Sequence, residues 1–463
     1  MKYNIEKVNQ IGKLLADVVE EALKAEGNEE VLIGDIEMAL RESMLKTGNS
    51  ALQCFLQNAD GKIEAEIECA CGGRLKYQRR RKATIWSVFD KVSYKRAYYA
   101  GCTCGKGCAP VDQRYGIEPG KVTCGLARLV SLCGIKEAFD GSRKSLKEFL
   151  LFEVSENTVR AETQKMGELQ RQADLELIKE TQNESSLQKR EQSQEPAPEV
   201  LYGSIDAAKV RIEPRTEKEK AIADREKWRD LKIGCWYEGE MVPQSRQSTR
   251  QKDKAQRDGV VLRAKNQKYF CDIEVAEQFG KLFWATGCAA GADRARFLVF
   301  ICDGAVWIWN LIAHYYPNSI QIVDWYHAAD RLTRIAKEAF ANPDECQAWR
   351  ERVTEDLWQG RVELVVEACQ VLSMKSDLAR QSLAYYGDNL ERMRYAQFRA
   401  MGYFIGSGII ESGCKQIVTQ RLKISGAQWN VDGAILTAKA RAAWLSNNWE
   451  KLVKTRSLFP LAA

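Results

Sequence analysis

The chain has 463 residues, of which 45% are hydrophobic and 29% are charged, and its net charge is +6. A chain of this size can hold two or three domains with substantial cores. It contains only two histidines, which nearly excludes multi-histidine zinc sites and Ser–His catalysis. A metal site must therefore use carboxylates or cysteines.

The sequence contains neither a membrane-spanning run nor a secretion signal. No apolar run reaches the roughly 18–20 uncharged residues that a membrane helix needs. The first residues, MKYNIEKVNQIGK, lack an apolar signal core. We therefore expect a cytoplasmic protein without a disulfide framework. Several cysteines stand alone in apolar segments, which indicates small buried side chains: Cys235, Cys288, Cys302, Cys369 and Cys414.

Residues 1–60 predict an N-terminal helical segment. Two amphipathic helices are expected, over 3–25 and 33–58. In the first, apolar residues starting with Ile5 and Val8 recur at helical spacing.

Residues 61–118 predict a β ribbon that carries cysteines at both ends. The segments CACGG and CTCGKGC flank a β-like stretch, and this arrangement resembles a zinc ribbon. The candidate zinc ligands are Cys69, Cys71, Cys104 and Cys108. Both knuckles are shorter than the usual CxxC, so the alternative is a ribbon-shaped remnant without metal.

Basic residues cluster in this ribbon and in a second segment later in the chain. Residues 74–96 hold nine lysines and arginines against one aspartate, and residues 241–268 hold eight against two acids. Such clusters fit contacts with nucleic-acid phosphates. The alternative for each cluster is a solvated surface. The candidate DNA contacts in the ribbon are Arg79, Arg80, Arg81 and Lys82.

Residues 119–168 predict a helix-turn-helix-like DNA-binding region. The helical segment KSLKEFLL is followed by a tight turn, and Ser155 then caps a helix that carries Asn157 and Arg160. Any surface helix pair could show the same pattern, so DNA reading is one of two interpretations. Residues 169–198 are polar and end in prolines, which indicates the tail of a helix that runs into a linker, with a domain boundary near residue 195.

After the linker, the pattern predicts an α/β domain. Apolar runs and helical segments alternate as β-β-β-α-β-α-β-α through residues 199–327, and no glycine-rich phosphate loop is present. This order resembles the mixed sheet of a ribonuclease-H-like core. Residues 328–402 read as entirely helical, which is too long for a loop and indicates an inserted helical domain. Residues 403–463 would complete the core.

Three acidic residues stand out by their positions. Asp206 follows the apolar run of the first strand, and Asp303 ends the fourth strand in LVFICDGAVWIW. Glu411 lies near the start of a later helix. In a ribonuclease-H-like core these positions converge. Clustered carboxylates favour Mg²⁺ or Mn²⁺, and two such ions would support phosphoryl transfer. The alternatives are a helix cap for Asp303 and a surface pair with Lys415 for Glu411.

A second acidic residue competes with Asp303 for the same role. Asp324 ends the next strand in QIVDWYH, and His327 follows three residues later. The two side chains can share one helical face. We interpret the pair as a support for the metal ligands, and a buried Asp–His pair or a cap is the alternative.

Several long motifs point to a known family. The runs YGSIDAAKVR, WRDLKIGCWYE, LFWATGCAAGADRARFLVFICDGAVWIWNLIAHYYPNSIQIVDWYHAADRL and GSGIIESGCKQIVTQRLKISGAQW resemble bacterial insertion-sequence transposases of the ISKra type. The resemblance covers residues 200–463 strongly and the N-terminal half more loosely. The string DWYH also resembles the [C/D]xxH string of the hAT and Mutator superfamilies, which carry a helical insertion before the catalytic Glu.

The resemblance implies a DDE-class enzyme whose catalytic triad is Asp206, Asp303 and Glu411. Metal-bound water would cleave a phosphodiester at a transposon end, and the freed 3′-hydroxyl would attack target DNA. Asp206 would bridge two ions, and Glu411 would complete the shell of the second. The partners would be terminal inverted repeats and target DNA, with at least a homodimer on DNA. The protein would then associate with the prokaryotic nucleoid.

Two other functions stay open from the sequence. One is a structure-selective nuclease with the same core. The other is a transposase-derived DNA-binding protein without catalysis. The shortened cysteine knuckles depart from the usual CxxC pattern, which puts zinc in question but not the catalytic core.

Overall fold

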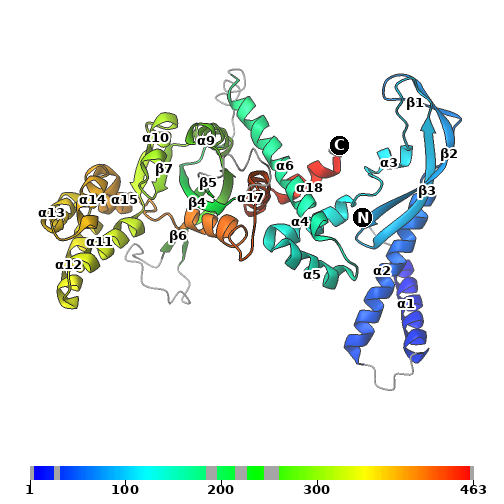
Figure 1. Cartoon of the computed structure of the whole chain (residues 1–463), viewed down its shortest axis with the longest axis horizontal. Coiled ribbons are helices and arrows are strands. Elements are labelled where there is room, and N and C mark those ends of the chain that lie inside the picture. The colour runs from blue at the N-terminus through cyan, green and yellow to red at the C-terminus, as the bar shows by residue number, and fades with distance from the viewer. Residues whose placement is uncertain (1–4, 26–31, 184–195, 214–226, 244–259, 459–463) are drawn as a thin grey trace. The chain divides into compact units, whose positions relative to one another are not determined.

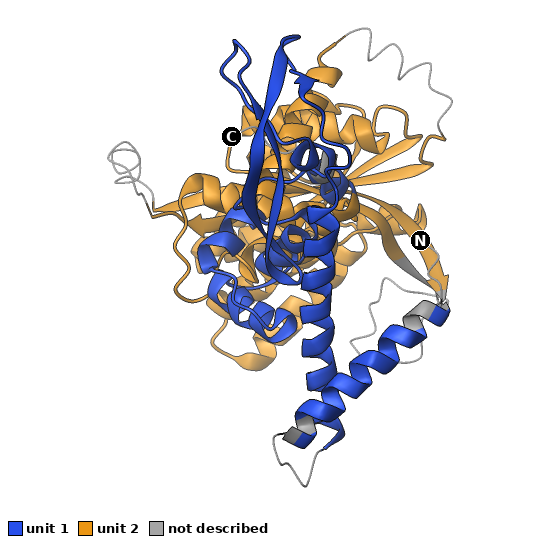
Figure 2. Cartoon of the chain, turned by 90° about the vertical axis from the view of Figure 1, so that its right-hand side faces the viewer, with its two compact units in different colours: residues 1–163, 451–463 blue, residues 164–450 orange. Residues whose placement is uncertain are grey.

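The computed structural model describes residues 5–25, 32–183, 196–213, 227–243 and 260–458. The chain divides into two compact units, which Figure 2 distinguishes by colour. Unit 1 comprises residues 1–163 and 451–463, and unit 2 comprises residues 164–450. Among the helices of the described ranges, none combines the length and apolar composition that crossing a bilayer requires.

Unit 1 is built around a three-stranded antiparallel sheet with the order β1-β2-β3. Its elements are α1 (Ile5–Ala25), α2 (Ile33–Gln57), β1 (Glu66–Glu68), β2 (Arg74–Ser87), β3 (Asp90–Ala100), α3 (Pro110–Arg114), α4 (Cys124–Lys136) and α5 (Phe139–Leu150). Helix α2 buries Leu56 against Ile85, Val92 and Tyr94 of the β2–β3 hairpin. The predicted N-terminal helices and cysteine-bearing β ribbon are therefore present.

A helical cluster follows the sheet in unit 1. Leu126 and Val130 of α4 pack with Leu146 of α5 and with Val159 of α6 (Glu156–Thr181). Thr158 N–H donates to the Ser155 hydroxyl at 3.1 Å, so this serine caps α6 as predicted.

Unit 2 contains a five-stranded mixed sheet with the order β6-β5-β4-β7-β8. Its first elements are β4 (Val200–Arg211), β5 (Trp228–Pro243), β6 (Val260–Asp272), α9 (Ala276–Ala290), β7 (Phe297–Cys302), α10 (Val306–Tyr315), β8 (Ile320–Val323) and α11 (Trp325–Ala339). β4, β5 and β6 pair antiparallel, whereas β4 with β7 and β7 with β8 pair parallel. The fold is thus mixed α/β, with the first and fourth predicted strands adjacent, as expected.

Aromatic side chains fill the core of this sheet. The Trp236 ring on β5 stacks on Phe283 of α9 with ring centroids 5.2 Å apart, and it meets Phe300 of β7 edge-on at 5.7 Å. At Gly203 on β4, a Cβ would lie 2.3 Å from the Phe300 ring. A larger residue at that position would therefore displace the core ring.

A group of helices separates β8 from the last part of unit 2. It continues from α11 with α12 (Pro343–Trp358), α13 (Val362–Leu372), α14 (Asp377–Gly387), the 3₁₀ turn η1 (Glu391–Met393) and α15 (Tyr395–Ala400). Figure 1 shows these helices gathered on one side of the sheet. The hydroxyl of Tyr395 donates to the backbone oxygen of Val323 at 3.0 Å, which ties the group to β8. The predicted helical insertion is confirmed in its secondary structure.

The chain ends with α16 (Gly408–Cys414), the π turn η2 (Lys415–Thr419), α17 (Val431–Leu445) and α18 (Trp449–Leu458). Lys439 of α17 is buried, and its Nζ lies 2.7 Å from Asp174 of α6 and 2.9 Å from Asp272 at the end of β6. Nζ also donates to the backbone oxygen of Cys271 at 2.9 Å. All three ammonium donors thus have acceptors, which offsets the cost of burying the charge.

Two expected boundaries differ from the structure. Helix α6 continues to Thr181 and so supplies the helix tail expected before the linker, and Asp174 on its second half pairs with Lys439. The unit boundary lies at residues 163/164 within this helix and not near residue 195. The end of the chain does not belong wholly to the core, since residues 451–463 group with unit 1. There Arg456 pairs with Glu162 of α6 at 2.6 Å. Residues 184–195 of the expected linker lie outside the described residues.

Candidate metal centres

Two of the predicted acids come from the adjacent interior strands β4 and β7 of the five-stranded sheet. In the parallel pairing of β4 with β7, Gly203 lies opposite Phe300. The same register continued places Asp206, on β4, beside Asp303, directly after β7. Burial raises the pKa of Asp206, and the neighbouring Asp303 carboxylate raises it further. The Asp303 carboxylate therefore lies near enough to disfavour the charged form of Asp206.

Each of these carboxylates is oriented by a local backbone donor. Asp206 Oδ1 accepts from the Ala207 N–H at 2.6 Å, and Asp303 Oδ1 accepts from the Ala305 N–H at 3.0 Å. The second oxygen of Asp206, Oδ2, lies 3.4 Å from Cys414 Sγ. These three partners, two backbone N–H groups and a thiol, carry no positive charge. They therefore do not neutralise the two carboxylates.

The third predicted acid, Glu411, lies on α16, and this helix packs against β4. Its Oε1 lies 3.6 Å from His327 Nδ1 and accepts from the Ser407 hydroxyl at 3.3 Å. The Glu411 side chain is 48% exposed. His327 also acts electrostatically on Asp206, and Asp303 acts on His327, so the three predicted acids surround His327. Among the described residues, however, they are not one of the groups whose ligand atoms all lie within 4.8 Å of one another. We call Asp206, Asp303 and Glu411 the carboxylate cluster.

Asp324 occupies a different environment from Asp303. It is fully buried and caps α11, where its Oδ1 accepts from the His327 N–H at 2.9 Å. Its Oδ2 accepts from the backbone N–H of Ser407. Burial alone would raise the pKa of Asp324, but the hydrogen bonds from His327 and Ser407 lower it below its usual value.

Asp324 in turn holds His327 as a cation. The hydrogen bond from His327 to Asp324 raises the pKa of the imidazole to about 9, with a contribution from Glu411. Asp324, His327 and Glu411 lie close enough together to form a metal site by distance alone. Both Asp324 oxygens already accept backbone hydrogen bonds, however. This favours Asp324 as the residue that orients His327, and Asp303 as the ligand.

Three residues near the cluster were missed by sequence reasoning. Ser407 and Cys414 lie one turn before and after Glu411, so the spacing in GSGIIESGC could have indicated them. Cys414 was expected to be an inert buried side chain; it is only partly buried and contacts Asp206. The hydroxyl of Tyr385 on α14 donates to the backbone oxygen of Asp303 at 3.4 Å. Nothing in the sequence around Tyr385 indicates this contact.

A second candidate centre lies at one end of the sheet in unit 1. The thiols of Cys69, Cys71, Cys102 and Cys104 lie within 4.8 Å of one another. Sulfur–sulfur distances are 3.4 Å for Cys69–Cys71, 3.4 Å for Cys71–Cys102 and 3.6 Å for Cys69–Cys104. Four sulfurs at about 2.3 Å from a tetrahedral zinc would be about 3.8 Å apart. The thiols therefore fit a zinc ion, and we call them the cysteine cluster.

Two matching turns build the cysteine cluster. Each has the sequence Cys-X-Cys-Gly, and the glycine N–H donates to the carbonyl of the first cysteine, at 2.8 Å for Gly72 and 3.0 Å for Gly105. Both glycines have positive φ, +85° and +73°. Only glycine adopts this conformation without strain. The shortened knuckles are thus closed by glycine turns.

One of the four predicted zinc ligands was wrong. Cys102 belongs to the cysteine cluster, whereas Cys108 lies outside it. The backbone of Cys108 pairs with Tyr99 in a β bridge, and its side chain packs against the apolar core beside the ribbon. Cys102 is the first cysteine of the second turn. The backbone N–H of Cys104 and the thiol of Cys71 lower the pKa of Cys102, whereas the hydrogen bond with Cys71 raises the pKa of Cys69.

The candidate DNA contacts all lie in unit 1. Arg79, Arg80, Arg81 and Lys82 are exposed on β2. Arg80 pairs with Asp60 at 3.0 Å, whereas the Arg81 guanidinium lies 3.8 Å above the Tyr98 ring. On α6, Asn157 is exposed and accepts a hydrogen bond from Arg160.

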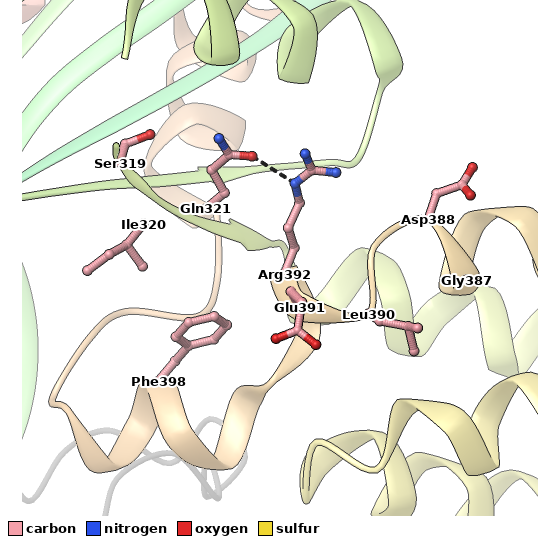
Figure 3. A pocket seen from close by; sticks show the side chains of 9 residues that line it. All are labelled: Ser319, Ile320, Gln321, Gly387, Asp388, Leu390, Glu391, Arg392 and Phe398. Carbon is pink, nitrogen blue, oxygen red and sulfur yellow. Dashed lines mark hydrogen bonds between the residues drawn. The ribbon is translucent and has the colours of Figure 1, made fainter. Parts of the chain in front are cut away.

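A pocket of about 570 Å³ lies apart from both centres (Figure 3). It opens at the start of β8, the opposite end of that strand from Asp324. There the Arg392 Nε donates to Gln321 Oε1 at 2.8 Å. The pocket therefore does not belong to the carboxylate cluster.

Comparison with models of known protein families and with curated protein sequences finds no match to this chain. The functional argument accordingly depends on the residues themselves.

Proposed function

We propose that this chain is a DDE-class DNA transposase with a ribonuclease-H-like core. It would cleave phosphodiester bonds at transposon ends and join the freed 3′ ends to target DNA. The observation that supports the proposal is that His327, which lies 3.6 Å from Glu411, also acts electrostatically on Asp206, next to Asp303. The three acids come from β4, the end of β7 and α16, three separate segments of unit 2.

The sheet supports the proposed core. Three antiparallel strands are followed by two parallel ones; Asp206 lies within the first of these strands, and Asp303 directly follows the fourth. The helical insertion precedes α16, as the resemblance to ISKra-type transposases implies. The string Asp324-Trp-Tyr-His327 begins α11 directly after β8.

The donor set fits hard divalent cations. Carboxylate oxygens are the ligands that Mg²⁺ and Mn²⁺ prefer, and adjacent like charges need a cation to coexist. When bound, two such ions would activate water and stabilise the leaving oxygen of an in-line displacement. Asp206, Asp303 and Glu411 would be the residues that hold the ions.

His327 would act beside the carboxylates. Its side chain is 49% exposed, and the buried Asp324 keeps it positively charged. A cation at the rim of the cluster can donate to a phosphate oxygen and orient the DNA backbone. Ser407 would fix both Asp324 and Glu411, since it donates to each of them through different atoms.

Unit 1 would supply DNA binding. Zn²⁺ in the cysteine cluster would hold the two Cys-X-Cys-Gly turns together and stiffen the basic ribbon. Arg79, Arg81 and Lys82 would contact phosphates, and the start of α6 would present Asn157 and Arg160 to the duplex. Pairing of two transposon ends requires at least two chains on DNA.

The test uses duplexes made from the DNA that flanks the coding sequence. The proposal predicts that purified protein nicks the labelled end at the repeat boundary in Mg²⁺ or Mn²⁺. It also predicts that a precut end with a free 3′-hydroxyl is joined to a plasmid. Cleavage without joining would instead support a structure-selective nuclease, and binding with neither reaction would support a non-catalytic DNA-binding protein.

A further inference from the structure

Tyr385 connects the helical insertion to the backbone of a predicted metal ligand. It lies on α14, and its hydroxyl donates to the backbone oxygen of Asp303 at 3.4 Å. Burial raises the pKa of Tyr385, Arg331 opposes the rise, and the Asp303 carboxylate adds to it. The phenol is therefore a hydrogen-bond donor that lies near the Asp303 carboxylate as well as its backbone.

The turn after β7 has room for the Tyr385 ring because residue 304 is a glycine. Gly304 has a φ of +97°, a conformation that residues with a side chain rarely adopt. A Cβ at this position would lie 2.9 Å from Cε2 of Tyr385. In the same turn, Asp303 Oδ1 accepts from the Ala305 N–H at 3.0 Å. The Tyr385 ring thus lies against the backbone of the turn that orients the Asp303 side chain.

A second helix holds the Tyr385 ring in place. The guanidinium of Arg331, one turn after His327 on α11, lies 4.6 Å from the centre of the ring. Arg331 Nε donates to the hydroxyl of Ser382 on α14 at 2.7 Å, so the cation is itself fixed. Contacts from α11 and α14 therefore determine where the phenol meets the turn after β7.

We propose that Tyr385 is a positioning residue of the carboxylate cluster, which fixes the turn at Asp303 so that the Asp303 carboxylate is oriented toward a divalent cation. The inference rests on the proposed function, which makes Asp303 a metal ligand. It also gives the helical insertion a role at the site, because α14 supplies the contact. Removing a group that orients a metal ligand costs about 10–100-fold in metal affinity or activity.

The test measures Mn²⁺ binding to the full chain by isothermal titration calorimetry, without DNA. Tyr385→Phe removes the hydroxyl and keeps the ring against the turn. We expect this variant to bind Mn²⁺ at the carboxylate cluster about tenfold more weakly than wild type does. Asp303→Asn identifies the site, because it should lose the Mn²⁺ that wild type binds there.

Tyr386→Phe is the matched control, since it removes a hydroxyl from the next residue of α14. The Tyr386 side chain is fully buried, and its hydroxyl donates to the backbone oxygen of Ala328 at 2.7 Å. Tyr386→Phe should therefore lower the melting temperature more than Tyr385→Phe does, yet leave the Mn²⁺ affinity unchanged. A purely structural role for Tyr385 would instead make Mn²⁺ affinity follow stability in the two variants.

Three results would overturn the inference. One is equal Mn²⁺ affinity in wild type and Tyr385→Phe. Another is an equal loss of affinity in Tyr385→Phe and Tyr386→Phe. The third is a wild-type protein without any Mn²⁺ site that Asp303→Asn removes.

The inference and the proposed function fail separately. Mn²⁺ binding needs no DNA, so a tenfold loss of affinity in a protein that never cleaves DNA would refute only the transposase. DNA cleavage by wild type, with unchanged Mn²⁺ affinity in Tyr385→Phe, would refute only the role of Tyr385. Where cleavage occurs, the Mn²⁺ concentration that gives half the maximal rate should rise about tenfold in Tyr385→Phe.

Discussion

The cysteine cluster and the carboxylate cluster are two candidate metal centres built in opposite ways. The four thiols come from two turns at one end of a small sheet, with neighbouring sulfurs 3.4–3.6 Å apart. The carboxylates come from distant segments, and Glu411 is half exposed. A closed set of four soft ligands suits a structural ion, whereas an open set of hard ligands leaves room for substrate. The difference predicts different responses to mutation.

The largest effect is expected in the cysteine cluster. Cys102→Ser should abolish zinc binding, because three thiolates and a hydroxyl hold zinc far less well than four thiolates. Structural zinc contributes about 10 kcal/mol or more to folding in small zinc domains. Hydrogen exchange should therefore show lost protection in β1, the two turns and the adjoining ends of β2 and β3.

Cys108→Ser is the matched control, since Cys108 lies on the same ribbon outside the cluster. It should keep zinc and the protection of the ribbon. If Cys108→Ser lost zinc and Cys102→Ser kept it, the observed ligand set would be wrong.

A smaller effect is expected for His327, which lies beside the carboxylate cluster. His327→Gln should lower the cleavage rate about 10–100-fold, the usual cost of removing a group that positions metal ligands. The loss should appear in kcat at saturating DNA, with zinc content unchanged. The control is His314→Gln, because His314 is the other histidine of the chain and lies at the end of α10. Equal rates for the two variants would contradict a role for His327.

The smallest effect is expected on the basic ribbon. Arg81→Ala should weaken DNA binding uniformly across sequences and reduce the slope of log K against log salt by about 1. Arg74→Ala is the control, because Arg74 lies on the same strand but pairs with Glu66 at 3.4 Å. Identical salt slopes for wild type and Arg81→Ala would exclude a phosphate contact at Arg81.

The apolar runs were sufficient to place Asp206 and Asp303 on adjacent strands, because the first and fourth strands were clear in the sequence. The end predicted for the first strand near Asp206 was wrong, since β4 continues to Arg211.

The sequence could not separate Asp303 from Asp324, since each acid ends a buried strand. The distinction depends on backbone donors: His327 and Ser407 occupy both oxygens of Asp324. Ser407 lies 83 residues after Asp324, and only the tertiary fold brings the two residues together. A local sequence pattern could not have revealed this contact.

The cysteine ligands show a similar limit. Three cysteines follow β3: Cys102, Cys104 and Cys108. Their spacing alone cannot show which two join Cys69 and Cys71 in one cluster. The turn closed by Gly105 selects Cys102 and Cys104, and the bridge to Tyr99 directs Cys108 elsewhere. Likewise, the polar composition indicated the tail of α6, but it could not reveal the buried pairing of Asp174 with Lys439, which lies far away in sequence.

Cleavage of a labelled transposon end by wild type, Asp206→Asn, Asp303→Asn and Glu411→Gln tests the central claim most directly. The account predicts cleavage in Mg²⁺ or Mn²⁺ but not in Ca²⁺, and a loss of roughly 10³-fold or more in each variant. DNA binding and the zinc content of the cysteine cluster should be retained. Cleavage at the wild-type rate in all three variants would contradict the account.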